Sequence, residues 1–193
     1  MLSIAANYMA DILYRKLNFP IKKKAVYVYG LELIGSTLAS MISIILIALW
    51  MNRLLDAFIF LIVFVSFRVV CGGYHAKTYR RCFLSSIGMF LFSSGLSMVL
   101  TNSVAVLLLG VFSGAVISLW APITNSCHPL SHKARKRNRR LALMFFSISF
   151  CWMVYQSFSR DTISHSLCLL VASMAAVAAL MIVAKIQGRR KRT

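Results

Sequence analysis

Acidic side chains are nearly absent from this sequence: Asp11, Glu32, Asp56 and Asp161 stand against 22 lysines and arginines. Only 13% of the 193 residues are charged, whereas 60% are hydrophobic and the mean hydropathy is +0.78. A soluble domain averages about a quarter charged residues, so an ordinary soluble domain is excluded. A net charge of +18 is compatible with nucleic-acid binding, but the basic residues form short clusters between long apolar runs rather than a water-facing surface. The composition therefore predicts a membrane protein with no nucleic-acid partner.

Several familiar sequence signatures are missing as well. There is no P-loop, no GxSxG, no HExxH motif, no internal repeat and no low-complexity segment. Cys127, His128 and His132 fit no standard zinc spacing, so we expect no metal and no other cofactor. The five cysteines are an odd number, and those at span ends face a predicted reducing compartment, so we expect no disulfides.

Long apolar runs account for most of the chain. A transmembrane helix needs about 20 predominantly apolar residues. The sequence predicts an all-α, polytopic membrane protein, formed by a single integral domain over residues 1–193 with six spans at about 31–50, 54–70, 83–101, 103–121, 141–158 and 163–184. The third and fourth spans form one charge-free run, which we expect to turn at residues 101–103.

The basic clusters predict the orientation of these spans. Nineteen lysines and arginines lie before the first span, in alternate connections and after the last span, whereas the other connections carry only Arg53 and Arg160. Cytoplasmic connections are enriched in such residues, so both termini are predicted to be cytoplasmic, and the run 133–140 is a topology determinant held near anionic lipid. Residues 1–19 are no cleavable signal peptide. Their apolar positions share one helical face, which predicts an amphipathic helix at the cytoplasmic interface.

The densest ionisable chemistry lies in residues 68–82, which read RVVCGGYHAKTYRRC. Arg68 ends an apolar run, so it either extends to the lipid headgroups or faces a polar cavity, where it binds a carboxylate or a developing oxyanion. Gly72 and Gly73 break the helix at little cost and leave room beside the following residues.

His75 and Cys82 follow as a candidate catalytic pair. A cysteine is a good nucleophile as the thiolate, which a nearby histidine and basic neighbours favour. Seven residues of continuous helix would separate the two by about 10 Å. The chain must therefore bend back between them, or the histidine must come from elsewhere, for instance from another subunit.

This motif resembles the signature of the accessory gene regulator B (AgrB) family, as do the residues APITNSCHPL (121–130) ahead of a basic run. The resemblance implies a membrane cysteine endopeptidase of Gram-positive bacteria. Such an enzyme removes the acidic C-terminal tail of a small AgrD-like precursor peptide and helps to form a cyclic thiolactone for quorum sensing. It assigns Cys82 as nucleophile and His75 as general base, and gives Arg68, Gly72 and Gly73 a substrate-binding or supporting role. It also implies membrane lipids and a second copy, as a homodimer, among the partners.

Two rival functions stay open at this point. In a transporter or exporter of a small peptide, Arg68 and His75 would line a pathway without covalent chemistry. A membrane scaffold would need neither. Away from the motif, Asp56 is predicted to lie at the membrane interface and His165 to be structural.

Overall fold

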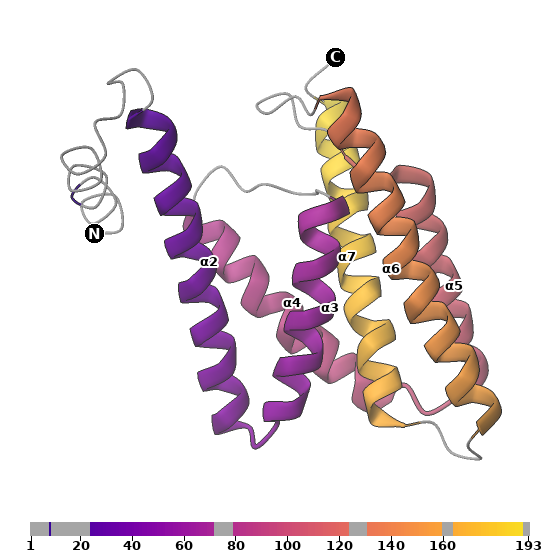
Figure 1. Cartoon of the computed structure of the whole chain (residues 1–193). Coiled ribbons are helices and arrows are strands. Elements are labelled where there is room, and N and C mark those ends of the chain that lie inside the picture. Colours follow the sequence, from indigo (N-terminus) through magenta and orange to yellow (C-terminus); the bar gives the residue numbers. More distant parts are fainter. Residues whose placement is uncertain (1–7, 9–23, 72–78, 124–130, 160–163, 191–193) are drawn as a thin grey trace.

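The computed structural model describes Tyr8 and residues 24–71, 79–123, 131–159 and 164–190, and the elements in these ranges are helices. They are α2 (Lys24–Trp50), α3 (Leu54–Cys71), α4 (Tyr79–Val99), α5 (Ser103–Trp120), α6 (His132–Ser159) and α7 (His165–Arg190) (Figure 1). The interfacial helix predicted over residues 1–19 lies outside the described residues, apart from Tyr8.

Successive helices run in opposite directions (Figure 1). We call the upper end in Figure 1, where α3 and α5 end and α4 and α6 begin, the basic end of the bundle. The opposite end, the far end, holds the connections from α2 to α3, from α4 to α5 and from α6 to α7. The alternation agrees with the predicted order of spans, while the cytoplasmic position of the termini stays a prediction.

Within the described ranges, five helices contain segments long and apolar enough to cross a membrane: Gly30–Trp50, Leu54–Cys71, Arg81–Val99, Ser103–Trp120 and His165–Gln187. They match the predicted spans 31–50, 54–70, 83–101, 103–121 and 163–184 to within a few residues. The remaining predicted span, 141–158, is the apolar part of α6. A sixth crossing by α6 stays a prediction.

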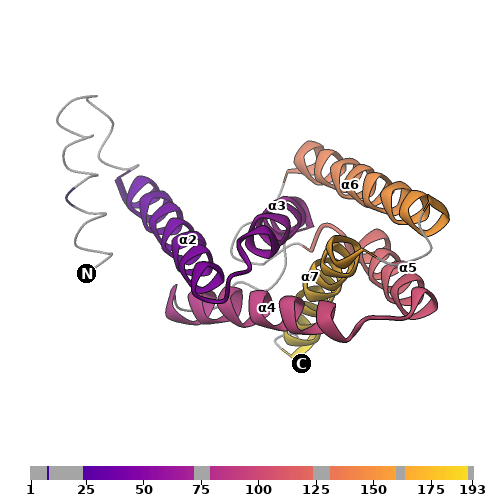
Figure 2. The ribbon, with the colours of Figure 1, turned by 90° about the horizontal axis from the view of Figure 1, so that it is seen from below.

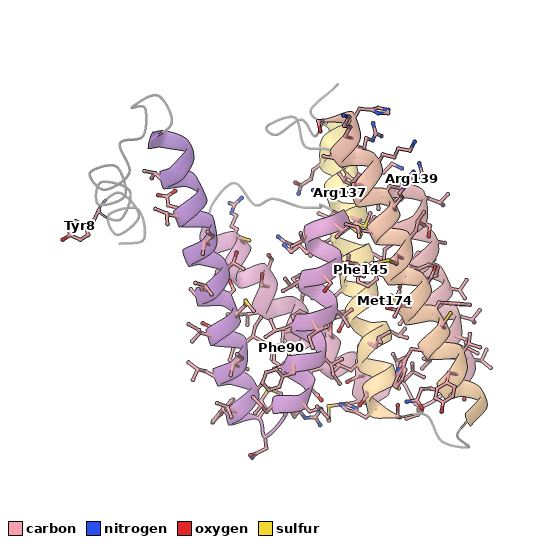
Figure 3. The ribbon with its side chains drawn as sticks, viewed as in Figure 1. Tyr8, Phe90, Arg137, Arg139, Phe145 and Met174 are labelled. Atoms are coloured by element: carbon pink, nitrogen blue, oxygen red, sulfur yellow. The ribbon has the colours of Figure 1, made fainter. Side chains whose placement is uncertain are left out.

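The basic run 133–140 is helical, not the connecting loop that the charge pattern indicated. It forms the first turns of α6, and Arg137 and Arg139 lie near the upper end of that helix (Figure 3). Lysine, arginine and alanine are good helix formers, so the helix extends beyond its apolar part. The Ser131 hydroxyl accepts a hydrogen bond from the Ala134 backbone N–H (3.2 Å) and so satisfies one free donor at the helix start. The cluster is therefore an exposed cationic helix.

α7 is the central helix, with α3, α4 and α5 packed around it (Figure 2). Two thirds of its candidate span (67%) is buried, against at most 44% in the others. Its buried side chains come from every face of the helix, among them Leu169, Val171, Met174, Val177 and Met181. A helix that is apolar all round belongs in the interior of a bundle.

Two connections at the far end, from α2 to α3 and from α4 to α5, are short and fully described. The predicted turn at residues 101–103 is confirmed, because α4 ends at Val99 and α5 begins at Ser103. The Asn102 side chain accepts a hydrogen bond from the Val104 N–H (2.9 Å), as expected of a helix N-cap. Between α2 and α3, Asn52 adopts a positive φ of 54°, a conformation that asparagine tolerates better than most residues.

Gly114 sets the distance between α5 and α6. A Cβ atom built on Gly114 would collide with the ring of Phe146. A side chain can therefore be added at this position only if that ring or the helix moves. We expect Gly114→Ala to lower the free energy of unfolding in detergent by about 1–3 kcal/mol, the usual cost of overpacking. Thermal or denaturant unfolding measures it.

Gly95→Ala in α4 is the matched control, since its Cβ would meet no atom within 4 Å. The control should keep or slightly raise the stability because alanine is the better helix former. Equal stabilities of the two variants would contradict the close approach of α5 and α6.

Candidate active site

The structure brings two of the predicted site residues together at the basic end. Arg68 lies in the last turn of α3, and Cys82 lies in the first turn of α4, 14 residues later. The Arg68 Nη2 donates to the Cys82 Sγ at 3.7 Å. Both side chains are half-buried. Arg68 therefore does not simply extend to the headgroups, because its guanidinium contacts the candidate nucleophile.

The Arg68 side chain packs on the first of three aromatic rings that contact one another in turn. The guanidinium carbon lies 5.6 Å from the centroid of the Phe64 ring, one turn earlier in α3. Phe64 is 3% exposed and stacks on Phe60 with centroids 4.8 Å apart, and Phe60 meets Phe90 of α4 edge-on. A cation over an aromatic face is attracted by the ring quadrupole. The spacing of four residues between Phe64 and Arg68 was a helical signal that the sequence analysis did not use.

The backbone around Cys82 belongs to the start of a helix. The Cys82 carbonyl accepts hydrogen bonds from the hydroxyls of Ser85 (2.8 Å) and Ser86 (3.0 Å). The first turn of a helix carries free N–H groups and the positive end of the helix dipole. Negative charge on the Cys82 sulfur would therefore meet a guanidinium on one side and a helix start on the other.

The other predicted site residues, Gly72, Gly73 and His75, lie outside the described residues. α3 ends at Cys71 and α4 begins at Tyr79, and the two helices run in opposite directions (Figure 1). The pairing of His75 with Cys82 stays a prediction.

The other described cysteines are poor alternatives to Cys82. Cys71 is fully buried at the end of α3, and Cys168 is buried in α7. Cys151 is exposed on α6, in the segment predicted to cross the membrane. These three cysteines and Cys82 are free thiols, and Cys127 lies outside the described ranges.

No group of three or more histidine, cysteine, aspartate or glutamate residues that could hold a metal ion occurs in the described part of the chain. Of the three residues weighed for a metal from the sequence, only His132 falls there, exposed at the start of α6. Among the described residues, the basic end offers the Cys82 thiol beside the Arg68 guanidinium.

A second polar cluster, which the sequence did not predict, lies at the far end. Asp56 was expected at the membrane interface, but it is only 4% exposed. Both of its carboxylate oxygens contact the His165 Nε2 (3.0 and 3.1 Å), and one also accepts from the Ser94 hydroxyl (3.2 Å) and from Arg53 (3.4 Å). Because these groups come from α3, α4 and α7, the carboxylate ties three helices together, which gives His165 the structural role predicted for it. A cavity of about 450 Å³ opens beside the cluster.

Comparison with known proteins decides the family. The family model described as Accessory gene regulator B matches residues 6–183, nearly the whole chain and all of the motif at 68–82. This chain belongs to the AgrB family. Membership connects it with the processing of agr quorum-sensing peptides, and its apolar helices fit a multi-pass membrane protein.

Two relatives come from Clostridium perfringens. AgrB-like protein 2 of strain 13 / Type A and the AgrB-like protein of strain SM101 / Type A are each 26% identical to this chain over 157 residues, covering 77% of it and 73% of the relative. No solved structure matches the chain.

Proposed function

We propose that this chain is a cysteine endopeptidase at the cytoplasmic face of the bacterial cell membrane. It removes the C-terminal tail of a small AgrD-like precursor peptide and promotes closure of the remainder to a thiolactone. The observation that supports this most is the contact between Arg68 and Cys82 at the start of α4, in a chain of the AgrB family. A structural cysteine has no need of a half-buried arginine on its sulfur.

In the proposed first step, the Cys82 thiolate attacks the carbonyl carbon at the cut site. His75 takes up the thiol proton beforehand and returns it to the leaving nitrogen as the peptide bond breaks. The tail leaves with a new amino terminus, and the rest of the precursor stays on Cys82 as a thioester. Arg68 stabilises the thiolate before the attack, and Gly72 and Gly73 leave room for the peptide backbone.

The second step exchanges one thioester for another. A cysteine of the precursor attacks the acyl carbon, the bond to the Cys82 sulfur breaks, and the ring closes with the enzyme thiol restored. Because a thioester is formed as one is lost, the exchange has little net cost in bond energy. Without that attack, water would release a linear product.

The cationic start of α6 is the proposed docking surface for the acidic tail. Its lysines and arginines at 133, 135, 136, 137, 139 and 140 are exposed. Surface charges attract over about 8 Å at physiological salt, so the tail would be gathered near the membrane. Anionic lipids and a second copy of the chain, as a homodimer, complete the proposed partners.

Trapping the acyl-enzyme tests this function. The full chain is co-expressed with a precursor whose ring-forming cysteine is changed to alanine, so that the thioester cannot be displaced intramolecularly. Intact mass spectrometry should show the chain carrying the precursor without its tail, located on Cys82 and removed by neutral hydroxylamine. The Cys82→Ser variant can carry only an oxygen ester, which hydroxylamine removes more slowly, and Cys151→Ser should keep the wild-type adduct.

The result also separates the enzyme from an exporter. A transporter of small peptides would move the precursor without acylation of any cysteine. An adduct on another cysteine, or a tail removed by the Cys82→Ala variant, would contradict the proposal.

A further inference from the structure

The last turn of α3, which carries Arg68, is tied to the segment that follows α5. The Ile123 backbone N–H donates to the Cys71 carbonyl at 2.9 Å. Cys71 is fully buried, and its neighbour Val70 is only 6% exposed, so this end of α3 is held in the core. The segment 121–123 is therefore bonded to the end of α3, although it lies about 50 residues away in the chain.

The end of α5 is fixed in turn by α7. The Lys185 ammonium lies 3.6 Å from the centroid of the Trp120 ring, and both side chains are half-buried. A lysine near the end of a span would ordinarily extend to water. Here it covers the face of the last residue of α5, in a favourable cation–π contact. We call the residues Cys71, Trp120, Ile123 and Lys185 the end clamp.

The end clamp is connected to the Cys82 sulfur through Arg68. Arg68 lies one turn before the clamped Cys71 carbonyl, and its Nη2 reaches the Cys82 Sγ at 3.7 Å. This contact between Arg68 and Cys82 tolerates little further separation, because hydrogen bonds weaken steeply as the distance grows and the angle bends. A small movement of the end of α3 would therefore separate the guanidinium from the sulfur.

We propose that Trp120 and Lys185 are positioning residues, which hold the end of α3 so that Arg68 stays on the Cys82 sulfur. Neither touches the reacting atoms; they act through Arg68. The consequence for catalysis rests on the proposed function, whereas the effect on the sulfur can be measured without any peptide.

The experiment measures the rate at which Cys82 reacts with a small alkylating reagent at neutral pH in the purified full-length chain. Peptide mass spectrometry resolves Cys82 from the other cysteines. Removing the cation in Lys185→Met should slow labelling at neutral pH by a factor of about 3 to 10, the loss expected from a cation–π contact of this kind.

Two further variants sharpen the result. Lys185→Arg keeps a cation over the ring and should restore the rate to within a factor of about 2. Trp120→Leu should match Lys185→Met, and the double variant should be no slower than either, since both remove one contact. Ile186→Ala, at an exposed neighbouring position in α7, is the control and should label like the wild type.

Thermal unfolding of each variant distinguishes a displaced arginine from a damaged fold. If Lys185→Met unfolds, the milder Trp120→Phe should still slow labelling, by a smaller factor. An unchanged labelling rate in Trp120→Leu, or a Lys185→Arg variant as slow as Lys185→Met, would overturn the positioning role. Labelling that follows the end clamp in a chain that never trims a precursor would uphold the clamp and refute the proposed function; normal trimming with unaffected labelling would do the reverse.

Discussion

Cys82→Ala should abolish trimming of the co-expressed precursor, with a loss of at least about 10³-fold. Removal of a catalytic nucleophile leaves only binding and electrostatic effects, which do not form the acyl intermediate. Mass spectrometry of the peptide from cells measures the ratio of trimmed to full-length precursor. Protein amount in the membrane fraction is measured in parallel, so that poor expression is not mistaken for lost chemistry.

Controls for this change come from the other cysteines. Cys151→Ser changes a thiol of α6 outside the site, and Cys71→Ala removes a buried thiol within the same motif. Both should continue to trim the precursor, the second with some loss of stability from the missing volume. Trimmed peptide in the presence of Cys82→Ala would refute the assignment of the nucleophile.

Arg68→Gln should lower the trimming rate by about 10²-fold, comparable to the loss of one preorganised donor in other active sites. Glutamine keeps polar character and some of the length but carries no charge, so it cannot stabilise negative sulfur as a guanidinium does. Arg68→Lys should be intermediate, because a lysine keeps the charge but loses the planar fork that lies over Phe64. Single-turnover trimming in membranes containing the purified variants measures the effect.

Arg53→Gln provides the matched control for charge. It removes one arginine at the other end of α3, where the partner is Asp56 and not a cysteine. Its trimming rate should stay near that of the wild type at a temperature where the fold is intact. Equal losses in Arg68→Gln and Arg53→Gln would mean that net charge matters and that the contact with Cys82 does not.

Apolar run length was enough to predict the helices of this bundle, because in a bilayer each backbone group must be bonded within its own helix. The spans at 54–70 and 103–121 correspond to α3 and α5 almost residue for residue. The basic start of α6 was missed because a charge count does not distinguish a loop from a helix of lysine and arginine. The burial of Asp56 was missed because its partners Ser94 and His165 lie 38 and 109 residues away.

The site was predictable in its residues but not in its contacts. The motif singled out Arg68 and Cys82, yet whether the arginine faces lipid, a cavity or the sulfur depends on how α4 crosses α3 after the turn. Likewise, Trp120 and Lys185 carry no local signal, since each alone is an ordinary residue at the end of a span. Relations of this kind depend on packing, and one sequence contains no direct record of them.

The position of α7 has a consequence for how the molecule is made. α7, against which α3, α4 and α5 pack, comes last of the six described helices in the chain, so it leaves the ribosome after the helices that it joins. Until then, Ser94 and Asp56 lack His165, and Trp120 lacks Lys185. Assembly of the interior is therefore a late event in biosynthesis.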